Sequence, residues 1–295
     1  VHMPAHIYIR TGRFNEAAQR NAAAAAVDEE YFKAAGPQPF YSMAYYLHNL
    51  QFESAAAMFA GNFAEAQRSA HITSTSAEPI ADQMAMLEAF AAQELLVLVR
   101  FAKWNEILAA KAPIPARTVL NGLHHWAQGV ALAETKKVTE AEHELTTLKD
   151  GATRVPKEAF VGPINWGGDV LAVAIADLNG RVRRARGDVS GAIAAFTQAV
   201  AAEDRLGYNE PPDWLLPERE QLGATLLRAG RAADAERVFR QDLVKHVGSP
   251  WALHGVWRSL DAMKSPNAAA AKQAFDDAWK SADVALGADF VPTAR

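Results

Sequence analysis

Apolar and small residues recur along the chain at steps of three and four positions, which is the period of an α-helix with one packed face. Ala192, Ile193, Phe196, Ala199 and Val200 form one such stripe. Glycine and proline gather between the periodic segments, at 36–39, 112–115, 209–212 and 249–250, and these residues favour connections. The pattern predicts helices throughout and no strand long enough to form a sheet.

A short motif marks the junctions between these helices. Gly12-Arg13-Phe14-Asn15-Glu16-Ala17 and Gly61-Asn62-Phe63-Ala64-Glu65-Ala66 share a small residue, an aromatic residue two places on and an alanine three places further. Related segments are anchored at residues 12, 61, 102, 136, 187, 230 and 264. The motif is typical of a tight helix–turn–helix, in which the anchor ends one helix and the alanine lets the next cross closely.

The seven segments resemble the tetratricopeptide repeat (TPR) family over nearly the whole chain. Their spacings are 49, 41, 34, 51, 43 and 34 residues, and the shortest equals the period of that family. Ala102, Lys136 and Lys264 depart from it by replacing the anchor glycine. The resemblance implies an all-α, right-handed superhelical solenoid of about seven repeats. It would form a single domain over 1–295, with a long loop at about 155–168.

Two further stretches, residues 2–7 and 210–214, look like those of bacterial tandem-repeat proteins. That narrower resemblance implies helical residues upstream of Val1.

Composition removes several kinds of chemistry. The net charge is -4, whereas a dedicated nucleic-acid binder carries a basic excess. No cysteine is present, so disulfides, cysteine-ligated metals and thiol nucleophiles are excluded, and cytoplasm and periplasm suit the chain equally. No apolar run approaches the roughly 20 residues that span a bilayer.

Alanine is the most informative part of the composition. The chain has 62 alanines in 295 residues, and the repeat gives many of them a place where paired helices cross. We expect five to be buried at such crossings: Ala17, Ala66, Ala141, Ala192 and Ala235.

The first helix of each pair lines the concave face in solenoids of this type, so candidate binding residues lie there. The repeat architecture favours a non-enzymatic module that binds a protein or peptide in this groove, and acidic and basic side chains are mixed on its surface. Its arginines suit carboxylate or phosphate ligands, or they form salt bridges between repeats. The candidates are Arg10, His48, Gln51, Arg100, Trp126, Asp177, Arg181, Arg228 and His254, with Glu210, Asp213 and Trp214 from the loop at 208–214.

A metal or small-anion site, with or without catalysis, is the alternative. His2 and His6 have the i, i+4 spacing with which two imidazoles grip a divalent metal. Neighbouring first helices pack about 10 Å apart, so His48 is the expected third ligand. Arg10 and the loop would complete the site. The simpler interpretation is that these histidines only pack and bond within the fold, and no other cofactor motif is present.

The loop Tyr208-Asn209-Glu210-Pro211-Pro212-Asp213-Trp214 has two interpretations. Its prolines stiffen the backbone, which suits a site wall that carries carboxylates and an indole. Alternatively the prolines end one helix pair and Asp213 caps the next helix. A third role for the whole chain is an assembly scaffold that uses open solenoid ends.

Overall fold

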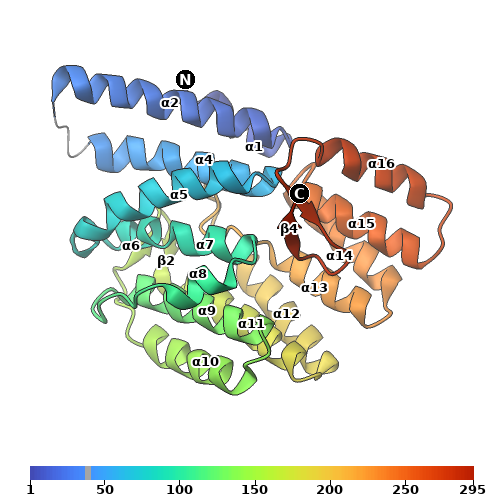
Figure 1. The fold of residues 1–295 in the computed structure, drawn as a ribbon. Coiled ribbons are helices and arrows are strands. Elements are labelled where there is room, and N and C mark those ends of the chain that lie inside the picture. Colours follow the sequence, from blue (N-terminus) through green and yellow to red (C-terminus); the bar gives the residue numbers. More distant parts are fainter. Residues whose placement is uncertain (37–40) are drawn as a thin grey trace.

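The computed structural model describes residues 1–36 and 41–295, and nearly all regular structure in them is helical (Figure 1). The predicted breaks at Pro37 and Pro39 lie outside the described residues. Seven helix pairs follow one another along the chain. They are α1 (Pro4–Arg10) with α2 (Phe14–Ala35), α4 (Leu47–Ala60) with α5 (Phe63–Ala77), α7 (Gln93–Arg100) with α8 (Trp104–Ala109), α9 (Thr118–Glu134) with α10 (Val138–Ala152), α11 (Gly167–Ala185) with α12 (Val189–Glu203), α13 (Glu218–Arg228) with α14 (Ala232–Lys245), and α15 (Pro250–Ala262) with α16 (Ala268–Ala278).

Irregular elements extend some of the connections. A π-helical turn, η1 (Ser42–Tyr46), leads into α4, while the 3₁₀ turn η2 (Glu78–Gln83) and α6 (Ala85–Ala91) lie between α5 and α7. Strands β1 (Phe160–Val161) and β2 (Asn165–Trp166) form one antiparallel hairpin, and β3 (Val284–Leu286) and β4 (Pro292–Ala294) form another. The prediction of an all-α, solenoid-like repeat protein is confirmed.

The predicted loop at 155–168 ends two residues early. Gly167 and Gly168 already belong to α11. A side chain would not fit at either position, because a Cβ on Gly167 would lie 2.5 Å from Val119 and one on Gly168 would lie 2.3 Å from the Trp166 ring. These glycines therefore allow close packing at a helix start and do not mark a loop.

All seven anchors adopt a left-handed backbone. Their φ angles lie between 53° and 82°, and Ala102, Lys136 and Lys264 share this conformation with the four glycines. In each pair the amide after the anchor donates to the carbonyl five residues earlier, at 2.8–3.0 Å. This hydrogen bond is characteristic of the Schellman motif, which satisfies carbonyls at a helix C-terminus. The turn geometry is therefore common to all seven pairs even where the glycine is missing.

The motif alanines lie at the helix crossings. Ala17, Ala66, Ala141, Ala192 and Ala235 are each 0% exposed, as predicted. Ala192 belongs to a buried cluster with Phe196, Leu222 and Phe239, which joins α12 to the α13–α14 pair. A methyl group is thus the side chain for which this crossing has room.

Enlarging Ala192 tests the register of the repeat. Ala192→Leu should lower the free energy of unfolding by about 1–3 kcal/mol, because overpacking forces neighbouring side chains out of place. Ala194→Leu, on the exposed face of the same helix, should change it by less than about 0.5 kcal/mol. Urea unfolding followed by circular dichroism measures both, and equal midpoints for the two variants would contradict the register.

The array of hairpins closes on itself. Consecutive helices pack along the chain, and the last pair also meets the first two (Figure 1). The Trp251 indole donates to the carbonyls of Met58 and Phe59 at 3.1 and 3.2 Å. The Asp283 carboxylate accepts the two amides at the start of α5. The free ends that a scaffold would use are therefore in contact with each other, because these terminal pairs bury complementary surfaces.

Closure also depends on two anchor glycines. A Cβ on Gly12 would lie 2.6 Å from the Val247 carbonyl oxygen, and one on Gly61 would lie 2.5 Å from the Trp279 ring. A Cβ on Gly230 would meet nothing within 4 Å. The first two turns therefore form part of the contact between the two ends of the array.

This difference predicts unequal costs for the same substitution. Gly230→Ala should cost about 1 kcal/mol, the strain of a left-handed alanine. Gly12→Ala should cost about 1–3 kcal/mol more, because the methyl group also collides with backbone. Chemical unfolding of the two variants provides the comparison, and equal losses would show that the ends do not meet as described.

None of the helices in the described part of the chain is both long and apolar enough to cross a bilayer.

Candidate functional site

Three predicted histidines meet near the N-terminus. His2 precedes α1, His6 lies within it and His48 lies in the first turn of α4. One ring nitrogen from each lies within 4.8 Å of those from the other two. The Nε2 atoms of His2 and His6 are 2.8 Å apart. A helical turn brings the first two rings together, and packing of the first hairpin on α4 adds the third.

Neighbouring acceptors fix the protonation of two rings. Asn21 donates its amide to the Ala17 carbonyl at 2.8 Å, so its oxygen faces His2 and accepts from Nδ1 at 2.7 Å. His6 Nδ1 is 2.6 Å from Oε2 of Glu210, a carboxylate that accepts. Both Nδ1 atoms therefore carry a proton, and in the neutral form of each ring the Nε2 atom carries a lone pair.

Two lone pairs then face each other across 2.8 Å, an arrangement that a cation between them stabilises. That cation is either a proton or a metal ion. Burial lowers the pKa of His2, and the neighbouring His6 charge lowers it further. Burial and both neighbouring histidines lower the pKa of His48 to about 4. Burial therefore favours the neutral form of His2 and His48, and neutral imidazole is the form that binds metals.

A rigid apolar floor holds the three rings. Phe52 is fully buried, and its ring centroid lies 5.4, 5.0 and 5.9 Å from those of His2, His6 and His48 in edge-to-face contacts. Asn21 is also fully buried. Hydrogen bonds to the second nitrogen and a packed floor are what orient histidine ligands in metal sites.

The loop at 208–214 closes one side of this cluster. Glu210 bonds His6 through one oxygen and accepts the Tyr208 hydroxyl through the other. The Arg10 Nε lies 3.8 Å from Glu210, and its guanidinium lies over the Tyr208 ring at 5.4 Å. The structure thus brings together His2, His6, His48, Arg10 and the loop, the components of the predicted composite site.

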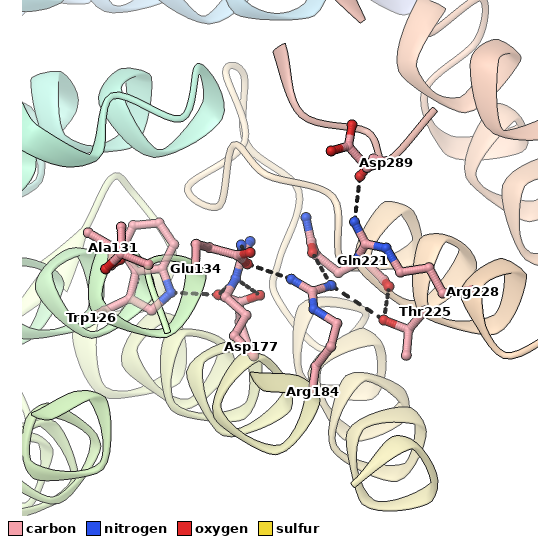
Figure 2. Close-up of polar contacts among 11 residues, drawn as sticks. Trp126, Ala131, Glu134, Asp177, Arg184, Gln221, Thr225, Arg228 and Asp289 are labelled. Atoms are coloured by element: carbon pink, nitrogen blue, oxygen red, sulfur yellow. Dashed lines mark hydrogen bonds and ion pairs between the residues drawn. The ribbon is translucent and has the colours of Figure 1, made fainter. Parts of the chain in front are cut away.

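A second polar cluster lies in the middle of the closed array (Figure 2). The Trp126 indole donates to Asp177 at 2.8 Å, and Arg181 binds both oxygens of the same carboxylate. Glu134 joins Arg181 to Arg184 at 3.1 and 2.5 Å. Burial raises the pKa of Glu134, but the two arginines outweigh it and bring the value to about 2. This network ties α9 to α11.

Other predicted residues are also bonded internally. Arg100 forms a two-point pair with Glu220 at 2.5 and 3.2 Å, and Arg228 donates to the Asp289 carbonyl. Trp214 packs against Trp126, with ring centroids 5.0 Å apart, and donates to Glu218. Arg100 is therefore ion-paired within the fold, whereas Arg228 bonds a backbone carbonyl.

Asp213 does not cap α13. Its carboxylate accepts the side-chain amides of Asn165 and Asn209 at 2.6 and 2.8 Å. The first amide of α13 is accepted by Glu203 instead. Gln51 and Asp213 line one small cavity of about 20 Å³, so the loop is fastened to β2 and faces α4.

Several candidates for the concave face lie in the interior. Trp126, Asp177, Trp214 and His254 are all at most 3% exposed. The sequence pattern treats each first helix as a free wall, whereas the loop at 204–217 and the C-terminal hairpin β3–β4 cover that face. No sequence period predicts this covering, because both segments are irregular. Asn21 and Phe52 were missed, although Asn21 is a lone amide on the alanine-rich face of α2.

His254 is enclosed by aromatic rings. Trp257, Phe275 and Phe290 have ring centroids 4.8–5.4 Å away, and neither ring nitrogen of His254 has a hydrogen-bond partner among the described residues. Burial and the Arg258 charge lower its pKa to about 3. The folded protein therefore keeps this imidazole neutral.

This burial predicts a pH dependence. Below about pH 6.5 the unfolded chain protonates His254 while the folded chain does not, so acid favours unfolding by up to about 1.4 kcal/mol per pH unit. His254→Leu should remove the contribution of His254 to this pH dependence. The free energy of unfolding of the variant should therefore rise relative to that of wild type as the pH falls from 6.5 to 4.5. Urea titrations at several pH values test this, and parallel curves would contradict it.

Comparison with protein-family models and with curated proteins finds no match to this chain. Any functional assignment therefore rests on the geometry of these sites.

Proposed function

We propose that this protein binds one divalent transition-metal ion through His2, His6 and His48. The observation that supports it is the pair of Nε2 atoms 2.8 Å apart, each on a ring whose Nδ1 donates to a fixed acceptor. Neutral rings in this arrangement repel, and a shared metal ion removes the repulsion. The third nitrogen lies within reach of the same point.

The donor set selects the class of metal. Imidazole nitrogen suits zinc, copper, nickel and iron, whereas magnesium and calcium prefer oxygen donors. Three histidines supply three of the four ligands of a tetrahedral zinc site, and three protein ligands with one open position are typical of catalytic zinc. Asn21 and Glu210 would orient two of the ligands from behind. We therefore expect zinc, with a coordination position left for solvent or a small ligand.

The interaction module remains the second proposal. Seven left-handed turns with the same hydrogen bond support the resemblance to TPR proteins. A peptide on the concave face, however, would have to displace the hairpin β3–β4 from it. We place metal binding first because its residues already converge without rearrangement.

Metal titration of the untagged protein tests the proposal. Calorimetry with ZnCl₂ at pH 7.5 should show one site per chain. His6→Ala and His48→Ala should each weaken it by roughly a hundredfold or more, because each removes a ligand. Asn21→Leu and Glu210→Gln should weaken it by roughly 10–100-fold, the usual effect of losing an orienting partner.

His143→Ala, on the exposed face of α10, is the matched control and should leave the affinity unchanged. Circular dichroism confirms that each variant is folded before titration. Absence of one-to-one binding, or equal binding by His6→Ala and wild type, would overturn the proposal.

A further inference from the structure

The middle of the closed array holds a cavity of about 60 Å³. A buried water needs about 10–15 Å³ measured in this way, so the space exceeds that of a single water. Four arginines from three of the hairpins line it, together with the tip of the C-terminal hairpin: Arg100, Arg181, Arg184, Arg228 and residues 289–292. This cavity is distinct from the histidine cluster.

The positive charges around the cavity outnumber the carboxylates that pair with them. Arg100 has Glu220, while Arg181 and Arg184 share Glu134, and Asp177 completes the pairing of Arg181. Three arginines thus face three carboxylates. Across residues 1–36 and 41–295, no carboxylate lies within ion-pair distance of Arg228. Among the described residues, Arg228 is therefore the one cavity arginine without a carboxylate in direct contact, although Asp289 also lines the cavity.

The guanidinium groups of Arg228 and Arg184 also donate hydrogen bonds to neutral oxygens. Arg228 donates to the backbone carbonyl of Asp289, and Arg184 reaches the Gln221 and Thr225 side chains at 3.2 and 3.4 Å (Figure 2). A carboxylate in place of these oxygens would add a full negative charge and a two-point geometry that matches the guanidinium. Arg228 is exposed, so a ligand can reach its fork from solvent.

The C-terminal hairpin β3–β4 covers the cavity, and we refer to it as the lid. Its base is fastened where Trp279 donates to the Val284 carbonyl at 2.9 Å. Its tip depends on Phe290, which stacks on Phe239 with centroids 5.5 Å apart and has a left-handed backbone, φ 65°. Because a left-handed phenylalanine is strained, its contacts must hold it in place. The stack on Phe239 therefore helps to hold the tip over the cavity.

We propose that this cavity binds the carboxylate group of a small monoanionic ligand. Arg228 is the principal partner of that carboxylate, and it donates to the Asp289 carbonyl instead when no ligand is bound. The planar guanidinium matches a carboxylate with two parallel hydrogen bonds. A monoanion adds only one negative charge beside Arg228, whereas a dianionic phosphate would add two to a cavity that Glu134, Glu220 and Asp289 already line.

Acetate is the probe. Melting temperature is measured at pH 7 in EDTA, with sodium acetate replacing sodium chloride at constant ionic strength, and line broadening of ¹³C-labelled acetate measures binding directly. The wild type should show a saturating rise in Tm. Arg228→Gln should raise the half-saturating concentration by roughly tenfold or more, since it loses a charged hydrogen bond. Phe290→Ala should lower that concentration, because it loosens the lid.

Arg237→Gln is the control, because this arginine is exposed on α14 and pairs only with Asp234. It should behave as wild type does. An unsaturable acetate effect, or the same effect in Arg228→Gln, would overturn the site. A lower half-saturating concentration for sulfate or phosphate than for acetate would overturn the preference for a monoanion. Weaker acetate binding by Phe290→Ala would show that the C-terminal hairpin does not restrict access to the cavity. EDTA keeps all these outcomes independent of the metal site.

Discussion

The close crossing of two helices behind a left-handed turn is the constraint on which this protein depends. The anchor residue reverses the chain within a few positions, and the buried alanine five residues later lets the second helix approach the first. At Lys136 and Lys264 the chain accepts a left-handed residue with a side chain, which costs about 1–2 kcal/mol relative to a right-handed one. The packing gained across each pair outweighs that local cost.

Repetition of this unit determines where polar residues come together. Closure brings the last pair against the first two, so the concave face becomes an interior that irregular segments fill. The buried arginines there are paired, as Arg100 with Glu220 and Arg181 with Asp177, because a buried charge without a partner is costly. The histidine cluster lies at the edge of the same interior, where the first hairpin meets the loop at 208–214.

Residue spacing predicts some contacts of the candidate histidine site and not others. His2 and His6 are one helical turn apart, so their proximity follows from local structure. His48 was placed by the repeat, which sets neighbouring first helices side by side. Glu210 lies 204 residues from its partner His6, and its contact depends on how the closed array folds a loop inward. The repeat predicts Trp126 and His254 on the concave face, whereas both side chains are fully buried in the structure.

The helix pairs, the seven turns and the buried alanines are predictable from the sequence, because each follows from a local period or from a residue a few positions away. The contact between the ends of the array, the place of Gly12 and Gly61 in it, and the covering of the central arginines by β3–β4 become visible only in the folded chain. Those features depend on complementary surfaces from distant segments, and no periodic signal in the chain encodes them. Charge pairing follows the same division: the residues are readable in the sequence, and their partners are set by the fold.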